Sequence, residues 1–393
     1  MIPKRSPQNY WREQDLAWRD PLQVAAQWMP TTHIDPVIFN YGESGEFFSL
    51  LEAFQITLLV TREYEHLVMA ITMSERGPEF SYVPLPHPSG LAVDRKLEVV
   101  YIASTRNPNM VFEFMPTHGT IQRLDVKSDS LDGSYRKPLM PYRSRYLAGC
   151  FYLHDLALID GDLYANSVGQ NAVVRLSEQK AKIVWWPHCI EQGNQPIFGQ
   201  NHIQLNSIAA GANLESSFFS ASASKISARR PGHRNFPVDK RGVIFSGKTR
   251  EPMAFGLTRP HSARLYEQRL YVDNSGYGEL TMIQNTAAIT LSKLPGWTRG
   301  LGFYKNVAFV GTSRVLPHFH QYAPGLDVEK SVCGIHAVDI KTGSILGSLI
   351  WPYGNQVFAI EPVPQAMTSG FPVILGHKNG SVEKRKLYYT YSL

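Results

Sequence analysis

The chain has 393 residues, of which 43% are hydrophobic and 18% charged. This composition excludes an intrinsically disordered protein and supplies enough apolar side chains for a sizeable core. The formal charge of +6 and the pI near 9.0 make the chain mildly basic, without the concentrated positive charge of a nucleic-acid-binding protein.

Residues 1–45 do not share the pattern of the rest, and we predict a short helical N-terminal extension there, followed by one domain over 46–393. Within the extension, WREQDLAWRDPLQVAAQW (11–28) predicts a pair of short helices whose tryptophans are buried anchors. The next element, QITLLVTREYEHLVMAITM (55–73), is strand-like and precedes the first repeat described below.

Six later stretches share one pattern. A polar or small residue opens a short apolar strand, a Gly- or Asp-bearing turn follows, and a second alternating strand ends in Ser, Asn or Thr. The openings are Ser89, His154, Asn206, His261, Arg299 and about Val357.

By subtraction, successive openings lie 65, 52, 55, 38 and 58 residues apart. Irregular repeats of about 40 to 60 residues, each with several short strands, predict a propeller. We therefore expect an all-β fold, a six-bladed β-propeller. Segment 55–73 would complete the last blade, so that pairing of the two chain ends closes the ring. A seventh blade between 89 and 154 is the alternative.

Some segments between the repeats are rich in charge or histidine. The basic stretch KISARRPGHRNFPVDKRGVIFSGKTR (225–250) is expected to be a solvated insertion loop, or alternatively a surface for an anionic partner. In PHFHQY, His318 and His320 are a weak metal-binding candidate in an expected surface loop. His87 and His188 each neighbour a proline and are expected in turns.

Cys150, Cys189 and Cys333 form neither a C-x-x-C motif nor an even set, so we expect no zinc site and no disulfide framework. A reducing, cytoplasmic location fits this cysteine content best. The N-terminus lacks an apolar signal segment, and no apolar run approaches the ~18 residues that span a bilayer. We therefore expect no membrane partner and no nucleic-acid partner.

Several stretches resemble, in order and spacing, a bacterial family of conserved hypothetical proteins known only as a domain of unknown function. They are LNSIA, RPHSARLYEQRLYVDNSGYGEL, LPGWTRGLGF, AFVGTSR and CGIHAVDIKTG. The resemblance covers about 50–365 and is most specific over 258–313. It implies a β-propeller and no particular activity. The third opening of the family reads Cys-His-Leu-Asn-Gly-Leu-Ala, so Gln204 stands here in place of that histidine, with His202 two residues earlier.

In a propeller the first strand of each blade lines the central channel, and its first residue sits at the channel mouth. The openings should therefore converge on one pocket. We predict His154, His261 and Arg299 as catalytic residues. The expected ligand-binding residues are Ser89, Asn206, Asp155 and Asn274.

This arrangement is distantly similar to the calcium-dependent lactonase and gluconolactonase propellers, which place Glu, Asn and Asp at comparable openings. Calcium prefers six to eight oxygen ligands, whereas imidazoles suit zinc, iron or copper. His154, Asn206 and His261 are thus expected to form an open divalent-metal site. In a metal-free alternative, a neutral histidine is the base and Arg299 holds a carboxylate, phosphate or sulfate.

The sequence thus predicts a pocket that binds a small anionic molecule, with hydrolysis or isomerisation as the reaction by fold-level analogy. The alternative function is a non-catalytic scaffold that binds a partner protein, through the basic stretch 225–250.

Overall fold

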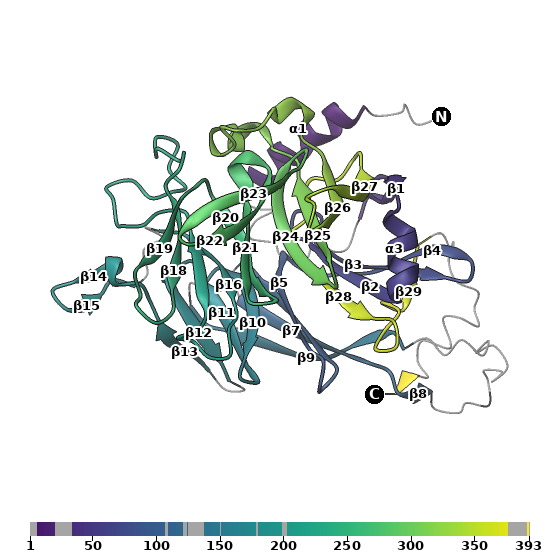
Figure 1. The fold of residues 1–393 in the computed structure, drawn as a ribbon. Coiled ribbons are helices and arrows are strands. Elements are labelled where there is room, and N and C mark those ends of the chain that lie inside the picture. The colour runs from purple at the N-terminus through teal and green to yellow at the C-terminus, as the bar shows by residue number, and fades with distance from the viewer. Residues whose placement is uncertain are drawn as a thin grey trace.

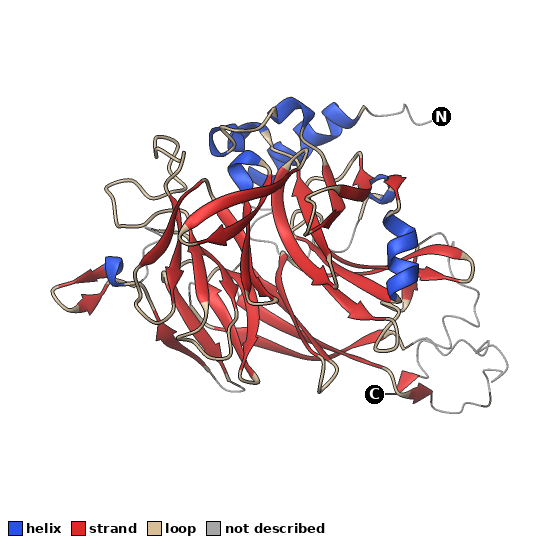
Figure 2. Cartoon of the chain, in the orientation of Figure 1, coloured by secondary structure: helices blue, strands red, loops and turns tan. Residues whose placement is uncertain are grey.

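The computed structural model describes residues 6–19, 34–106, 109–120, 124, 137–149, 151–177, 180–198, 203–375 and 391–392. Six antiparallel sheets of four or five strands form the blades of a propeller (Figures 1 and 2). The predicted six-bladed all-β fold is confirmed. Between 89 and 152 the described strands belong to the first blade, apart from a two-residue strand at Gly119–Thr120, so the described residues form no seventh blade there.

The first three blades follow the chain in order, innermost strand first. The first contains β5 (Pro88–Asp94), β6 (Val99–Ser104), β7 (Asn109–Pro116) and β9 (Leu139–Leu147). The second contains β10 (Leu153–Ile159), β11 (Asp162–Ser167), β12 (Ala172–Leu176) and β13 (Ala181–Trp185). The third contains β16 (Leu205–Ala209), β17 (Phe218–Ala221), β18 (Gly242–Ser246) and β19 (Pro252–Leu257).

The other three blades complete the ring. The fourth contains β20 (Pro260–Tyr266), β21 (Arg269–Asn274), β22 (Glu279–Gln284) and β23 (Ala287–Lys293). The fifth contains β24 (Trp297–Tyr304), β25 (Val307–Ser313), β26 (Cys333–Asp339), β27 (Ile345–Trp351) and β1 (Gly42–Gly45). The sixth contains β28 (Ala359–Pro364), β2 (Ile56–Arg62), β3 (Leu67–Ser74), β4 (Gly77–Pro84) and β29 (Val373–Ile374).

The sixth blade joins the two ends of the chain, as predicted for segment 55–73. Strand β28 pairs antiparallel with β2, in a register that runs from Ile56 opposite Pro364 to Thr61 opposite Ala359 (Figure 1). This pairing closes the ring, so β2 and β28 cover each other's hydrogen-bonding edges.

The apolar core lies between successive blades, where the faces of neighbouring sheets pack together. Trp185 on the outer strand of the second blade contacts Phe219 of the third, with ring centroids 4.1 Å apart. Its indole nitrogen donates to the carbonyl of Gly247 at 2.9 Å, because a buried N–H needs a partner. This tryptophan therefore packs between two blades.

Short helices and two small strand pairs complete the described structure. The helices are α1 (Pro7–Arg19), η2 (Pro36–Phe39), α3 (Phe47–Phe54), η4 (His188–Ile190), η5 (Ser275–Tyr277), η6 (Pro317–Tyr322) and η7 (Val328–Lys330). The small pairs are β14 (Glu191–Gln192) with β15 (Gln195–Pro196), and β8 (Gly119–Thr120) with β30 (Tyr391–Ser392). None of the described helices is both long and apolar enough to cross a membrane.

The N-terminal extension is less separate from the propeller than its sequence indicates. Helix α1 packs through the buried Tyr10 edge-on against Tyr353, 5.8 Å between centroids, and contacts η6 at the top of Figure 1. Strand β1 belongs to the fifth blade, although it falls within the predicted extension. The second expected helix lies in 20–33, outside the described residues, as do Cys150 and His202.

Candidate functional site

A cavity of about 310 Å³ lies at the end of the propeller where the inner strands begin. Every blade contributes to its wall, because each inner strand enters the ring there. Blades one to six are represented by Arg106, Tyr152 with His154, Gln204, His261, Arg299 and Gln356. The predicted convergence of distant segments at the channel mouth is therefore present in the fold.

The openings are shaped by irregular backbone. The inner strands β5, β10, β16, β20 and β24 all shift register within their first residues, and such bulges turn side chains away from the regular alternation. Four residues, each two positions before an opening, adopt left-handed φ values of 45 to 53°: His87, Tyr152, Gln204 and Arg259. This conformation is costly for a residue with a Cβ, and it sets the sharp entry into each inner strand.

The three predicted catalytic residues surround the same cavity. Arg299 of the fifth blade reaches His154 of the second, with its Nη2 3.4 Å from Nδ1 of the imidazole. The guanidinium lies over the ring of Phe358, 3.3 Å from its centroid. His261 lines the cavity from the fourth blade. The geometry thus brings His154, His261 and Arg299 together, and their catalytic role stays a prediction.

The hydrogen bonds of His261 define its tautomer. Its Nδ1 lies 2.8 Å from the carbonyl oxygen of Arg259 and 2.9 Å from Oγ of Ser275. A carbonyl oxygen can only accept, so Nδ1 carries the proton and Nε2 keeps a lone pair. Burial, and then the charges of Arg299 and Arg259, lower the pKa of His261 well below 6.5. The imidazole is therefore neutral at pH 7.

His154 is neutral for the same reasons. Burial, followed by the charges of Arg299, Arg259 and Arg106, lowers its pKa well below 6.5. Because the guanidinium of Arg299 can only donate, Nδ1 of His154 is the acceptor in their contact. The two histidines thus differ in tautomer: Nδ1 carries the proton in His261 and accepts in His154.

Positive charge dominates the cavity wall. Five arginines line it: Arg106, Arg230, Arg259, Arg299 and Arg314. Within the described part of the chain, Glu63 is the one carboxylate in the wall. Burial lowers the pKa of Arg259 and of Arg299 to about 10, and the charge of Arg299 further lowers the pKa of Arg259. Both remain protonated at neutral pH, so their charges are present in the cavity.

These arginines differ from two paired arginines elsewhere in the propeller. Arg62 pairs with Glu65 at 2.9 Å and Arg264 with Asp155 at 2.7 Å. By contrast, four cavity arginines form no ion pair with any described residue: Arg230, Arg259, Arg299 and Arg314. The partners of Arg259 are neutral, namely Oε1 of Gln204 and the ring of Tyr322, 4.4 Å away.

Three predicted ligand-binding residues lie outside the cavity wall, because their side chains join strands to neighbouring segments. The hydroxyl of Ser89 donates to the carbonyl of Leu153 at 2.7 Å. Nδ2 of Asn206 donates to the carbonyl of Pro260 at 2.9 Å. Oδ1 of Asn274 accepts from the backbone N–H of Thr258 at 2.7 Å. In blade three the cavity is lined by Gln204, two residues before the predicted Asn206.

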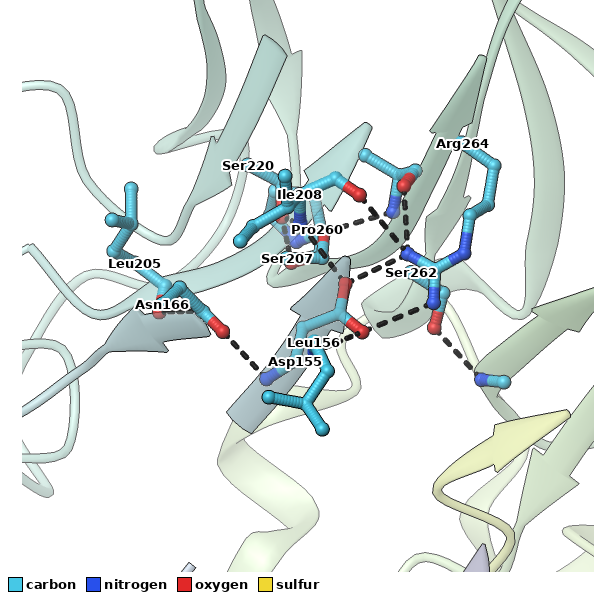
Figure 3. Close-up of polar contacts among 12 residues, drawn as sticks. Asp155, Leu156, Asn166, Leu205, Ser207, Ile208, Ser220, Pro260, Ser262 and Arg264 are labelled. Carbon is cyan, nitrogen blue, oxygen red and sulfur yellow. Dashed lines mark hydrogen bonds and ion pairs between the residues drawn. The ribbon is translucent and has the colours of Figure 1, made fainter. Parts of the chain in front are cut away.

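Asp155, the fourth predicted ligand-binding residue, joins three blades (Figure 3). Its two oxygens accept from Arg264 of the fourth blade at 2.7 and 3.0 Å. One of them also accepts from the backbone N–H of Ile208 in the third blade at 3.0 Å. This saturated carboxylate is absent from the cavity wall, so its geometry indicates a structural role.

The predicted metal site does not fit the geometry. Asn206 is turned towards Pro260, and the described residues hold no group of three or more His, Cys, Asp or Glu side chains able to bind a metal ion. His154 and His261 share their cavity with several uncompensated cations, which repel a divalent ion. His318 and His320 lie in η6 instead of an irregular surface loop, and it is Phe319 between them that lines the cavity.

Sequence reasoning missed much of the cationic wall. The stretch 225–250, expected to be a solvated loop, contains β18 and supplies Arg230 and Gly232 to the cavity. Arg259 occupies the position two residues before its opening, equivalent to Gln204. The family histidine at the latter position was the one sequence signal that could have pointed there.

Comparisons with known proteins bear on the family and the fold. Residues 45–371 match a family model described as "Domain of unknown function (DUF4915)", as the resemblance predicted. No curated protein matches the sequence.

Among solved structures, a chain of the nidogen/laminin complex aligns with a TM-score of 0.51 and 9% identity, covering 78% of this chain and 98% of that one. A gluconolactonase from Xanthomonas campestris aligns with a TM-score of 0.42 and 15% identity, covering 68% and 77%. Regucalcin from Agrobacterium tumefaciens, a calcium-binding protein, aligns with a TM-score of 0.40 and 9% identity, covering 66% and 73%. At these identities the similarity concerns the fold alone.

Proposed function

Because the chain belongs to the DUF4915 family, a domain of unknown function, we propose a role from the cavity itself: the propeller binds a small molecule that carries more than one negative charge. One observation carries the proposal. Arg230, Arg259, Arg299 and Arg314 line a single cavity and form no ion pair with any described residue.

The energetics support an anion as the missing partner. Removing a cation from water without a partner costs several kcal/mol. This cost falls on the buried Arg259 and in part on the half-buried Arg299 and Arg314, whereas Arg230 is exposed. The charge of Glu63 offsets part of one arginine. Guanidinium groups form paired, charge-assisted hydrogen bonds with carboxylate, phosphate and sulfate. A ligand with two or more such groups would neutralise the wall, and a cavity of about 310 Å³ suits a small molecule.

For the chemistry we propose hydrolysis or isomerisation of the bound anion, with Nε2 of His261 as the proton acceptor. The carbonyl of Arg259 holds the ring in the required tautomer. In the unliganded protein the imidazole is a weak base, because burial and the arginines lower its pKa. A bound anion offsets the field of Arg299 and Arg259 and so raises the pKa of His261 towards the working range of a general base.

A non-catalytic scaffold is the second candidate. A further cavity of about 490 Å³ is lined by Lys225, Arg229 and Arg241 in the segment that also supplies Arg230 to the first cavity. An acidic protein segment would suit these cations. This candidate predicts capture of an acidic partner and no tight binding of small anions.

Isothermal titration of sulfate and citrate at low salt tests the proposal. We expect citrate to bind more tightly than sulfate, and Arg259→Gln to weaken both by about tenfold, the effect of one charge-assisted hydrogen bond. Arg95→Gln is the matched control, because Arg95 is half-exposed and paired with Glu361 at 2.9 Å. Equal binding to both variants, or no binding of either anion, would contradict an anion site in this cavity.

A further inference from the structure

Glu63 lies in the turn between β2 and β3 and is buried, at 5% exposure. It lines the cavity beside Tyr64. Its charge counteracts the lowering of the pKa of Arg299 by burial, so the two groups interact electrostatically across the cavity. A carboxylate in this otherwise cationic wall repels a bound anion and so weakens the binding of a simple anion. We therefore ask which ligand group this carboxylate could bind.

The hydrogen bonds of Glu63 leave one oxygen available to a ligand. The hydroxyl of Thr105 donates to Oε1 and fixes the carboxylate. Oε2 makes no hydrogen bond with the described residues and is not sealed from the cavity. Since an ionised carboxylate can only accept, Oε2 offers a ligand a strong acceptor.

His261 offers a second acceptor to the same cavity. Its Nδ1–H is engaged by the carbonyl of Arg259, so the lone pair of Nε2 is left for a ligand. The wall therefore combines donors, the guanidinium groups, with acceptors that include Glu63 Oε2 and His261 Nε2. Sulfate or an unsubstituted carboxylate has no proton to offer these acceptors at neutral pH and would bury them without a partner.

We propose that the ligand of this cavity is a hydroxylated polyanion, a hydroxy acid or a hydroxylated phosphate ester, and that Glu63 is the residue that selects its hydroxyl group. Acidic groups bind the arginines, and a hydroxyl group donates to Oε2 of Glu63. The inference rests on the proposed anion site, and it adds the substrate class and a specificity-determining residue that the sequence patterns do not indicate.

Matched diacids distinguish a general anion site from a site that also selects a hydroxyl group. Succinate, both enantiomers of malate, and tartrate carry the same two carboxylates and differ in hydroxyl groups, and titration calorimetry measures their dissociation constants. We expect at least one malate enantiomer to bind about tenfold more tightly than succinate, the effect of one hydrogen bond to a charged group. Sulfate is titrated alongside as an anion without hydroxyl groups.

Glu63→Gln is the decisive variant, because it keeps the shape and an acceptor for Thr105 but removes the charge. We expect succinate to bind more tightly to this variant than to wild type, while the preference for malate falls to about threefold or less. A purely structural glutamate would not change the ratio of the two affinities. Glu251→Gln, at an exposed carboxylate paired with His188, should leave the preference unchanged.

The outcomes are distinguishable. Equal binding of succinate and malate to wild type would overturn the inference, as would an unchanged preference in Glu63→Gln. It also fails if sulfate binds and neither diacid does. If sulfate, succinate and malate all fail to bind, the anion site itself is wrong. Should Glu63→Gln not fold, Thr105→Val, which removes the hydroxyl that fixes the carboxylate, is expected to reduce the malate preference.

Discussion

Two partly buried arginines of the propeller should respond in opposite directions to the same substitution. Arg299 lies in the cavity wall without an ion pair, whereas Arg264 binds both oxygens of Asp155 at 2.7 and 3.0 Å. We predict that Arg299→Met raises the free energy of unfolding of the ligand-free protein. Arg264→Met should lower it, because that change leaves Asp155 as an unpaired buried charge.

The magnitudes follow from the surroundings of each cation. Burial lowers the pKa of Arg299 from 12.5 to about 10, which corresponds to at most about 3 kcal/mol of unfavourable charge. Water in the cavity screens part of this cost, and methionine keeps an apolar contact with the ring of Phe358. A gain of about 1 to 2 kcal/mol is therefore expected. Breaking the pair between Asp155 and Arg264 should cost about 3 to 5 kcal/mol.

Thermal unfolding measures both changes. For 393 residues, an unfolding entropy of ~2.1 cal/mol/K per residue gives about 0.8 kcal/mol/K, so 1 kcal/mol shifts Tm by about 1 °C. We expect Tm to rise by about 1 to 2 °C in Arg299→Met and to fall by about 4 to 6 °C in Arg264→Met. Arg299→Met should also lose the stabilisation that citrate confers on wild type. Destabilisation of both variants to the same extent would refute the distinction between paired and unpaired cations.

Three further predictions concern the wall, the blade contacts and pH. Arg230→Gln should weaken citrate binding about tenfold, whereas Arg229→Gln, in the neighbouring cavity, should not; equal effects in calorimetry would contradict the placement of Arg230. Asn206→Leu should lower the free energy of unfolding by about 1 to 3 kcal/mol without changing anion affinity, because the side chain of Asn206 binds a backbone carbonyl. If this variant bound anions more weakly while its stability in urea was unchanged, Asn206 would be a ligand-binding residue after all. Burial lowers the pKa of His66 and of His336 from 6.5 to about 4. As the pH falls below 6.5 the unfolded chain therefore takes up protons that the folded chain excludes, and each histidine should cost about 1.4 kcal/mol of stability per pH unit down to about pH 4. Urea denaturation at pH 7, 6 and 5 checks this slope, and a flat profile would contradict it.

Much of the architecture was readable from local patterns. The strand-like segment 55–73 was predicted as one element of the closing blade, and it contains two strands there, β2 and β3. The repeat openings also marked the starts of the inner strands correctly, from Ser89 on β5 to Arg299 on β24. Such features depend on neighbouring residues along the chain, so a single sequence contains them.

The polar residues were harder to place. Asn206 and Gln204 are two positions apart and both could serve a ligand, yet the first holds a neighbouring blade and the second lines the cavity. The register shift in β16 and the left-handed backbone at Gln204 decide between them. Neither feature leaves a reliable mark in the sequence, because both arise from the fit of one blade against the next.

The amino-acid sequence alone predicted six blades, with seven as the alternative, together with their order and the closure of the ring, because strand period and turn residues act over a few positions. Only the tertiary structure decided that Arg299 reaches His154 from the opposite side of the channel, and that Glu63 and Arg230 share its cavity. The proximity of these side chains depends on side-chain length, on bulges and on contacts between blades. A chemical site assembled across a ring is therefore a property of the packing, whereas the ring itself follows from local chemistry.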